Sequence, residues 1–264
     1  MAKKKQAPPA KAKGSRRRKP GPIRDRRSIE KFHADIGRLL ETQDFKSEEE
    51  ANAFLQQFVG RDVPIPCPRE LTPLEQAQEV MYEAFEASGK RRVTLARKAL
   101  EVSPDCADAY VLLAEEWADS LPEAMHLYRQ GVEAGERALG PQAFEEDVGN
   151  FWGILGTRPY MRARAGLAQC LWASGQRQAA VQHLTEMLRL NPNDNQGVRY
   201  PLATWLLTEG ADDALGRLLK QYEGDVSATW LYTKALWVFR REGVGRKANA
   251  ALRKAFEFLS LIHI

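Results

Sequence analysis

Cysteine is scarce in this chain of 264 residues, and the three that occur, Cys67, Cys106 and Cys170, lie far apart without any Cys-x-x-Cys pair. This spacing argues against a disulfide framework and against a cysteine-based zinc site. Long apolar runs are also missing, since none approaches the ~20 residues that cross a bilayer. We therefore expect a protein of the reducing cytoplasm with no membrane partner.

Signals for catalysis are missing as well. The sequence has no glycine-rich phosphate loop and no evident nucleophile–base pair. The pairs Glu30–His33 and Glu123–His126 have the Glu-x-x-His spacing of di-iron bundles, but no further carboxylates are marked to complete such a site. We expect no catalytic residue, no metal and no cofactor, and hence a protein that is not an enzyme.

Charge is divided unevenly along the chain. Residues 1–27 hold 12 Lys and Arg residues and one acid, whereas the remainder holds 27 basic and 34 acidic residues. Because residues 1–27 contain almost no large apolar side chain, we expect a disordered basic tail. Two interpretations stay open: the tail binds nucleic-acid phosphates without sequence preference, or it folds back on the acidic remainder. The candidate polyanion-binding residues are Lys3, Lys4, Lys5, Arg16, Arg17, Arg18 and Lys19.

Residues 28–71 are expected to form a small helical segment followed by a proline-rich linker. Apolar residues recur at three- and four-residue spacing from Ile29 to Leu40. Ser47 and Glu50 have the spacing of a capping box that opens a second helix. The prolines within 63–68 favour extended chain. We expect this segment to pack against the rest of the molecule, because it is too small to stand alone.

The stretch 160–192 carries the strongest pattern in the chain. Ala168 and Ala180 are small where two helices would cross closely, Gly175 allows a turn between them, and Pro192 ends the second helix. This spacing resembles the 34-residue tetratricopeptide repeat. The resemblance implies an all-α, tetratricopeptide-like solenoid of helix–turn–helix units, whose concave groove binds other chains.

About five such repeats are expected over 72–258, and the second, third and fifth fit the pattern best. Thr72, Pro73 and Glu75 have the order of a helix cap, a first-turn proline and a capping-box acid that open the first repeat. Residues 140–159 are expected to be a long connection. This connection either fills an irregular gap or covers the groove edge. Residues 259–264 lack a polar terminal cap, and we expect them to be a non-native or truncated end of a longer protein.

Parts of the sequence also resemble two groups of proteins that contain such repeats. Residues 151–153, 157–164 and 191–200 look like a group of bacterial tetratricopeptide proteins of undefined function. Residues 227–236 are similar to the suppression-of-tumorigenicity-seven family. That family has the same repeat type and no assigned catalytic residues, so the resemblance implies the fold and transfers no site chemistry.

Projection of the repeat pattern places an acidic region at one end of the groove, formed by Asp108, Glu115 and Asp119. Aromatic and basic residues follow, and such side chains are frequent binding hot spots. The candidate groove residues are Arg162, Gln169, Trp172, Tyr200, Thr204, Trp230, Trp237, Arg240 and Arg241, with Thr233 beside them. The alternative for the tryptophans is burial between repeats. An acidic or C-terminal peptide segment would suit Arg162 together with Arg240.

The groove lacks one known recognition device. Some co-chaperone repeats hold a terminal carboxylate with a lysine and an asparagine, but Ala165 and Gln169 stand on the corresponding helix faces. We therefore expect a protein-interaction scaffold or adaptor that binds some other peptide or protein in its groove. The alternative is a nucleic-acid- or ribosome-associated factor that uses the basic tail.

Overall fold

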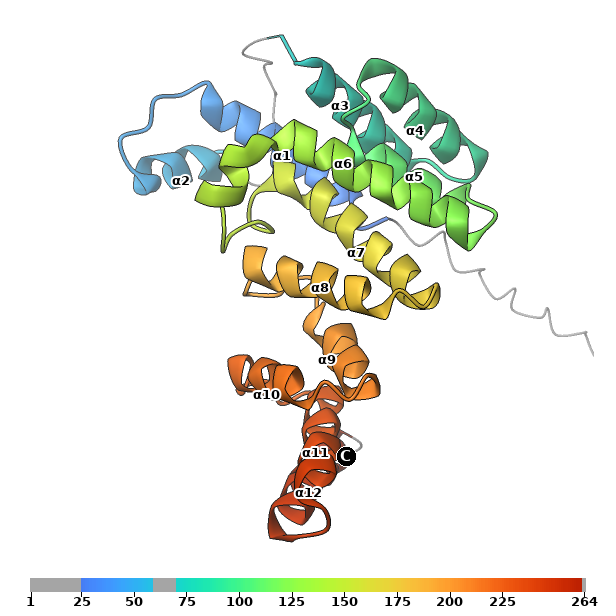
Figure 1. Ribbon diagram of the computed structural model, residues 1–264. Coiled ribbons are helices and arrows are strands. Elements are labelled where there is room, and N and C mark those ends of the chain that lie inside the picture. Colours follow the sequence, from blue (N-terminus) through green and yellow to red (C-terminus); the bar gives the residue numbers. More distant parts are fainter. Residues whose placement is uncertain (1–24, 59–69, 263–264) are drawn as a thin grey trace, which may run out of the picture.

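The computed structural model describes residues 25–58 and 70–262. Within these two ranges the chain forms twelve α-helices and one short 3-10 helix, and no strand (Figure 1). The predicted all-α class is therefore confirmed. The basic residues from Lys3 to Lys19 lie outside the described residues.

Ten of the helices form consecutive pairs in chain order. Two helices, α1 (Ser28–Glu41) and α2 (Glu48–Gln56), precede them. The pairs are α3 (Pro73–Glu86) with α4 (Lys90–Val102), α5 (Ala107–Glu116) with α6 (Leu121–Glu146), α7 (Arg158–Ala173) with α8 (Arg177–Leu190), α9 (Arg199–Thr208) with α10 (Asp212–Gln221), and α11 (Ala228–Glu242) with α12 (Arg246–Ile262). Each pair packs on the next, and the 3-10 helix η1 (Leu155–Thr157) leads into α7. This order is the tetratricopeptide-like solenoid that the repeat pattern predicts (Figure 1).

Local chemistry explains where the helices begin. At α3, the Thr72 hydroxyl accepts a hydrogen bond from the Glu75 backbone N–H at 3.3 Å, and the Glu75 carboxylate accepts one from the Thr72 N–H at 2.8 Å. The predicted capping box is thus complete. At α2 only half of the predicted box forms, because the Glu50 carboxylate accepts from the backbone N–H of Lys46 instead of Ser47. Between α7 and α8, Gly175 has a φ of 84°, the left-handed conformation that the turn requires.

The predicted long connection over 140–159 is wrong in its first half. Helix α6 continues to Glu146, with a kink at Gly140, whose φ of 70° and ψ of 167° interrupt the helical geometry. Pro141 follows at the start of the new segment, where a proline ring fits without loss of a hydrogen bond. The second half fills a gap in the core: Phe151 is fully buried, and its ring centroid lies 5.3 Å from that of Phe144.

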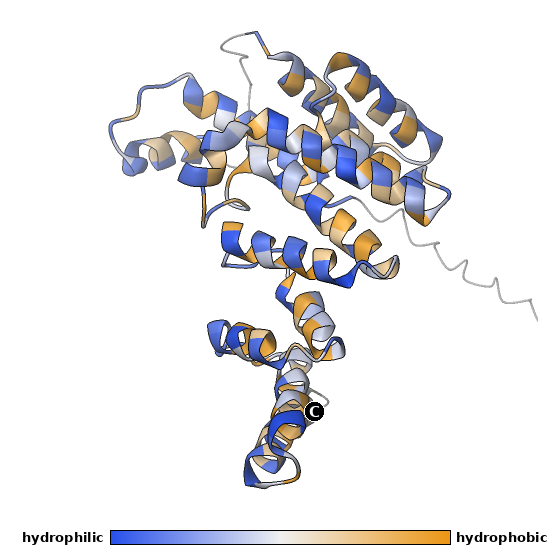
Figure 2. Ribbon diagram, viewed as in Figure 1, coloured by the Kyte–Doolittle hydropathy of each residue, from blue (hydrophilic) through white to orange (hydrophobic). Residues whose placement is uncertain are grey.

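Hydrophobic and hydrophilic residues alternate along the helices, as amphipathic helices in a solenoid require (Figure 2). The buried apolar residues form two clusters. One lies in α3 to α6 around Met81, Phe85 and Leu112, and the other extends from α5 to α11 around Tyr160 and Leu184. Among the described helices, none has both the length and the apolar character that a bilayer crossing needs.

Candidate functional site

Helix α1 lies on the surface where a partner would be expected to bind. We call this surface the groove face and define it as the side formed by the first helices of the pairs, α3, α5, α7, α9 and α11. Helix α1 packs against α3 and η1. Side chains of α1 and of Arg27 just before it also pair with residues of α5 and α7. The N-terminal half of the groove face is therefore occupied by a helix of the same chain.

Arg162 of α7 is the centre of this contact. Its Nε and Nη2 donate to the two carboxylate oxygens of Asp108 on α5 at 2.8 and 2.7 Å. Its Nη1 and Nη2 donate to the carboxylate of Glu30 on α1 at 2.8 and 3.0 Å. Burial alone would lower the pKa of the Arg162 guanidinium, but the two carboxylates outweigh burial and raise it. One arginine thus links three helices through two bidentate pairs.

Two more residues complete this network. The Arg158 guanidinium lies 3.3 Å from the Glu30 carboxylate, and the Gln78 side-chain amide of α3 donates to Asp108 at 3.1 Å. Glu30 is 5% exposed and Asp108 is 0% exposed. Buried carboxylates are tolerated when they are paired and hydrogen-bonded. Asp108 therefore does not belong to the predicted acidic end of the groove, because it is buried and paired with Arg162, whereas Glu115 and Asp119 are exposed.

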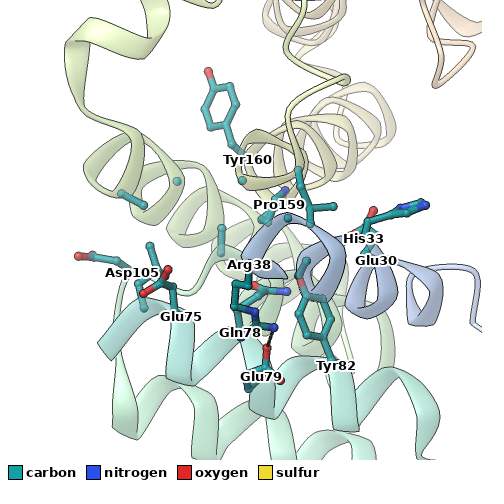
Figure 3. Close-up of a pocket in the computed structure, with 18 of the residues that line it drawn as sticks. Glu30, His33, Arg38, Glu75, Gln78, Glu79, Tyr82, Asp105, Pro159 and Tyr160 are labelled. Atoms are coloured by element: carbon teal, nitrogen blue, oxygen red, sulfur yellow. Dashed lines mark hydrogen bonds and ion pairs between the residues drawn. The ribbon is translucent and has the colours of Figure 1, made fainter. Parts of the chain in front are cut away.

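A second group of ion pairs joins α1 to α3. The Glu79 carboxylate of α3 lies 2.5 Å from the Arg38 guanidinium and 3.2 Å from the Lys31 ammonium. Asp35, on α1 itself, also contacts both cations, at 2.8 and 3.2 Å. Figure 3 shows the pair between Arg38 and Glu79 bridging the two helices. The polar face of α1 is thus matched by opposite charges on the repeats.

A third group lies just before α1. The Arg27 guanidinium lies 2.8 Å from the Glu115 carboxylate of α5, and the Asp25 carboxylate lies 2.6 Å from Arg92 of α4. Burial alone would raise the pKa of Asp25, but hydrogen bonds from Arg27 and Arg92 outweigh burial and lower it. Residues 25–27, which lead into α1, are therefore held by ion pairs to both α4 and α5.

A cavity of about 400 Å³ opens beside α1. It lies between α1, α3, α6 and the η1–α7 junction, and its wall includes Tyr82, Glu75, Pro159 and Tyr160 (Figure 3). Burial raises the pKa of the Tyr82 hydroxyl, and the nearby carboxylates raise it further. The hydroxyl therefore stays protonated. Apolar walls with a few polar groups can hold a side chain of a bound segment.

In the C-terminal half of the groove face, Trp172 is half-buried. Its ring stacks on that of Trp205 of α9, with centroids 4.5 Å apart. The Arg177 guanidinium lies 4.5 Å from the centre of the Trp172 ring. Gln169, one turn earlier on α7, is exposed. Trp172 is thus fixed in place while part of its surface remains accessible.

Tyr200 is also half-buried and hydrogen-bonded. Its hydroxyl donates to the Asp225 carboxylate at 2.8 Å, and Arg199 donates to the same carboxylate at 2.8 Å. Burial alone would raise the pKa of Asp225, but hydrogen bonds from Ser227, Arg199 and Tyr200 lower it to about 2. Thr204, one turn further along α9, is exposed.

Trp230 is not on the groove face. It is 1% exposed, and the rings of Tyr200 and Tyr222 contact it edge-on, each with its centroid 6.0 Å away. This placement corrects the predicted groove role and agrees with the alternative of burial between repeats. Thr233, in the next turn of the same helix, is also buried.

The remaining predicted residues on α11 contact the start of α10. The Trp237 indole N–H donates to the Asp212 carbonyl at 2.8 Å, and the Arg240 guanidinium pairs with the Asp212 carboxylate. Arg241 lies 3.4 Å from Asp213. These contacts hold neighbouring pairs together, although both arginines keep exposed surface. Arg162 and Arg240 therefore do not form a shared free site, since each already binds a carboxylate of the chain.

The described residues contain no group of three or more His, Cys, Asp and Glu side chains arranged to hold a metal ion. Of the two residues with Glu-x-x-His spacing on α1, Glu30 binds Arg162 and His33 is exposed. Burial, with Asp108 nearby, raises the pKa of the Cys106 thiol to about 12. A thiol with such a pKa is a poor nucleophile at neutral pH.

The sequence could not reveal the network around Arg162. Arg162 itself was expected in the groove, but its partner Glu30 lies 132 positions earlier, in a helix expected only to pack somewhere on the repeats. Arg158 was not singled out at all. Its position one turn before Arg162 on the same helix face was the available signal.

Comparisons with known proteins agree with the resemblance to the suppression-of-tumorigenicity-seven family. The model of the ST7 protein family matches residues 67–242. The chain is 44% identical over 64 residues to "Suppressor of tumorigenicity 7 protein-like" of Bos taurus, and this match covers 24% of the chain and 12% of the relative. It is 40% identical over 62 residues to "Protein ST7 homolog" of Caenorhabditis elegans, covering 23% of the chain and 12% of the relative.

Among solved structures, the chain is similar to the one titled "Crystal structure of YrrB: a TPR protein with an unusual peptide-binding site". The identity is 19% and the TM-score is 0.47, with 78% of this chain and 92% of that chain covered. The matched segments span only about an eighth of the curated relatives. The family model, in contrast, covers more than half of the chain, and on this ground the chain belongs to the ST7 protein family.

Proposed function

We propose that this protein is a non-catalytic interaction scaffold that binds a peptide or protein segment on its groove face. The tetratricopeptide-like helix pairs suggest such a role by their architecture. The observation that carries the proposal is the helix already bound there: α1 is held by Arg162, Arg158 and Glu79 through charge-assisted hydrogen bonds and ion pairs. A surface that binds one helical segment in this way has the chemistry to bind another.

The accessible part of the groove face is its C-terminal half. Gln169 and Thr204 are exposed, and Trp172 and Tyr200 are half-exposed beside them. Tryptophan and tyrosine supply large contact area at low entropic cost. Because Trp172 stacks on Trp205, and Tyr200 is hydrogen-bonded to Asp225, these side chains are ordered before a partner arrives. Such preorganisation reduces the cost of binding.

Two threonines allow a matched test. Thr204 is on the groove face and Thr185 is on α8, a second helix of its pair. Both are exposed, and each hydroxyl donates to the carbonyl four residues earlier. We expect Thr204→Arg to lose the proteins that the wild-type full chain captures from nuclease-treated lysate, whereas Thr185→Arg retains them. Captured proteins would be compared by quantitative mass spectrometry, after circular dichroism has shown that both variants are folded.

Three outcomes would contradict the proposal. If both variants retain every partner, or lose the same partners, the groove face is not the binding surface. If all partners disappear with nuclease treatment, nucleic acid mediates the association, which is the outcome that the basic residues Lys3 to Lys19 would explain.

A further inference from the structure

Helix α1 presents its charges to the repeats and part of its apolar face to solvent. Ile29 is 58% exposed and Phe32 is 56% exposed, while Glu30 between them is 5% exposed. Among the large apolar residues of α1, only Leu39 is fully buried. A helix that belongs permanently to a core does the reverse, because burial of large apolar side chains is the main source of its stability.

Ion pairs are a large part of the attachment of α1, beside the apolar contacts of Leu39 and Ala34. Glu30 binds Arg162 and Arg158, and Lys31 and Arg38 bind Glu79. The pairs of Glu79 with Lys31 and Arg38 keep part of their surface exposed, and attraction between partly exposed charges is weakened by salt and by competing ions. The attachment of α1 to the repeats should therefore weaken as the salt concentration rises, unlike a purely apolar contact.

The surface under α1 is already complete without it. Arg162 keeps both of its hydrogen bonds to Asp108, and Asp108 keeps the one from Gln78, when Glu30 is taken away. Departure of α1 thus leaves no isolated buried charge, which would otherwise be costly. The cavity of about 400 Å³ along one side of α1 also shows that the helix does not fill the space at the density of a protein interior.

We infer that α1 is a displaceable internal ligand of the groove face, and that the surface it covers on α3, α5 and α7 fits a partner helix with a carboxylate at the position of Glu30. This inference rests on the proposed function of the groove face. Arg162 offers two N–H groups to that carboxylate, and Arg158 adds a third. Glu79 accepts a basic residue that follows the acid by eight positions, as Arg38 follows Glu30.

The partner chemistry follows from these contacts. A competing helix must supply an acid and, about two turns later, a lysine or arginine, because both cations that bind Glu79, Lys31 and Arg38, leave with α1. Because α1 is joined to α3 through residues 42–72, its rebinding is intramolecular and competes with any partner in solution. A partner must therefore bind more tightly than α1, or α1 must be weakened first.

The test uses the full chain and a fluorescein-labelled synthetic peptide with the sequence of residues 25–43. Fluorescence anisotropy would measure binding of this peptide to wild type, to Glu30→Gln and to the control Glu41→Gln. Glu41 is an exposed acid at the end of the same helix. We expect Glu30→Gln to bind the peptide at least tenfold more tightly than wild type, because its own α1 competes less well. Glu41→Gln should behave like wild type, and a peptide that itself carries Glu30→Gln should not bind.

Hydrogen exchange on the wild type provides the second measurement and does not depend on any variant folding. Raising the salt concentration from 50 to 500 mM should speed exchange of the α1 amides at least tenfold and leave α7 unchanged. Equal protection of α1 and α7 at both salt concentrations would overturn the inference, as would unchanged peptide affinity in a folded Glu30→Gln. Tight binding of the Glu30→Gln peptide would contradict the inference that the partner helix needs a carboxylate at this position.

Failure of this inference is distinguishable from failure of the proposed function. If α1 proves fixed while Thr204→Arg still loses the captured proteins, the groove face is a binding surface whose N-terminal half is permanently closed. If Thr204→Arg changes nothing while the peptide binds Glu30→Gln as expected, α1 is displaceable but the proposed partner site on α9 is wrong.

Discussion

The indole rings of Trp172 and Trp205 are parallel to within 4°, with their centroids 4.5 Å apart. The first ring belongs to α7 and the second to α9, so the stack joins two consecutive helix pairs at the groove face. Trp205 is buried beneath Trp172. An aromatic contact of this kind stabilises the junction and orients the half-exposed ring for binding.

Replacement of Trp205 tests this junction. We expect Trp205→Ala to lower the free energy of unfolding by about 3–5 kcal/mol, because it removes a large buried ring and leaves a cavity under Trp172. Trp117→Ala is the control, since Trp117 is 42% exposed. Its loss should be below about 1 kcal/mol. Urea unfolding followed by circular dichroism measures both, and equal losses would mean that the stack contributes nothing specific.

A close approach of α6 and α7 depends on Gly135. A Cβ atom at this position would lie 2.8 Å from the Tyr160 Cβ and 3.1 Å from its Cα, so the backbone of α7 would have to move. We expect Gly135→Ala to cost about 1–3 kcal/mol of stability, as other overpacked sites do. Gly37→Ala, in α1, meets nothing within 4 Å. It should instead gain about 0.5–1 kcal/mol from helix propensity, as measured in the same urea experiment.

His183 makes stability depend on mild acid. Burial lowers its pKa from 6.5 to about 4, and the charges of Arg164 and Arg129 contribute. Between these two pH values the His183 imidazole is protonated in the unfolded chain and neutral in the folded chain. The free energy of unfolding therefore falls as the pH drops from about 6.5 to 4. We expect His183→Gln to flatten this part of the curve of melting temperature against pH. Replacement of the exposed His126 by Gln should leave it unchanged, and an identical slope in both variants would contradict the assignment to His183.

Asp225 has a pH dependence of the same sign, at lower pH. Its pKa in the folded protein is about 2, below its ordinary value of 3.8. The ionised carboxylate therefore contributes its full stabilisation above about pH 4, and this contribution is lost as the pH falls through 2. We expect Asp225→Asn to melt below wild type at pH 7, with the difference shrinking between pH 4 and 2. Asp213→Asn, at an 87% exposed side chain, should show little difference at either pH.

The parts of the fold that local spacing determines were predictable from the sequence. Ala168, Ala180 and Gly175 identify a close helix crossing and its turn, and Thr72 marks a helix start, because each requirement is met within a few residues. The course of the chain at Gly140 was not predictable, since a glycine can end a helix or kink it. At that point packing of Phe151 against Phe144 and Tyr160 decides the outcome.

The groove residues were harder to predict than the repeats. Trp230 and Trp237 are seven positions apart on one helix, yet the first is in the core and the second contacts α10. A small error in helix phase moves such residues from one environment to the other. The pairing of Arg162 with Glu30 has no local signal at all, because complementary charge does not identify one partner among many acids.

The position of Arg162 between two enclosed carboxylates also determines what its loss would do. With a neutral residue in its place, Asp108 would keep only the Gln78 amide as a donor and would have no access to water. A buried carboxylate without a counterion is strongly destabilising. A single substitution at Arg162 would therefore weaken the contacts among α1, α5 and α7 together, because all three helices meet at this one side chain.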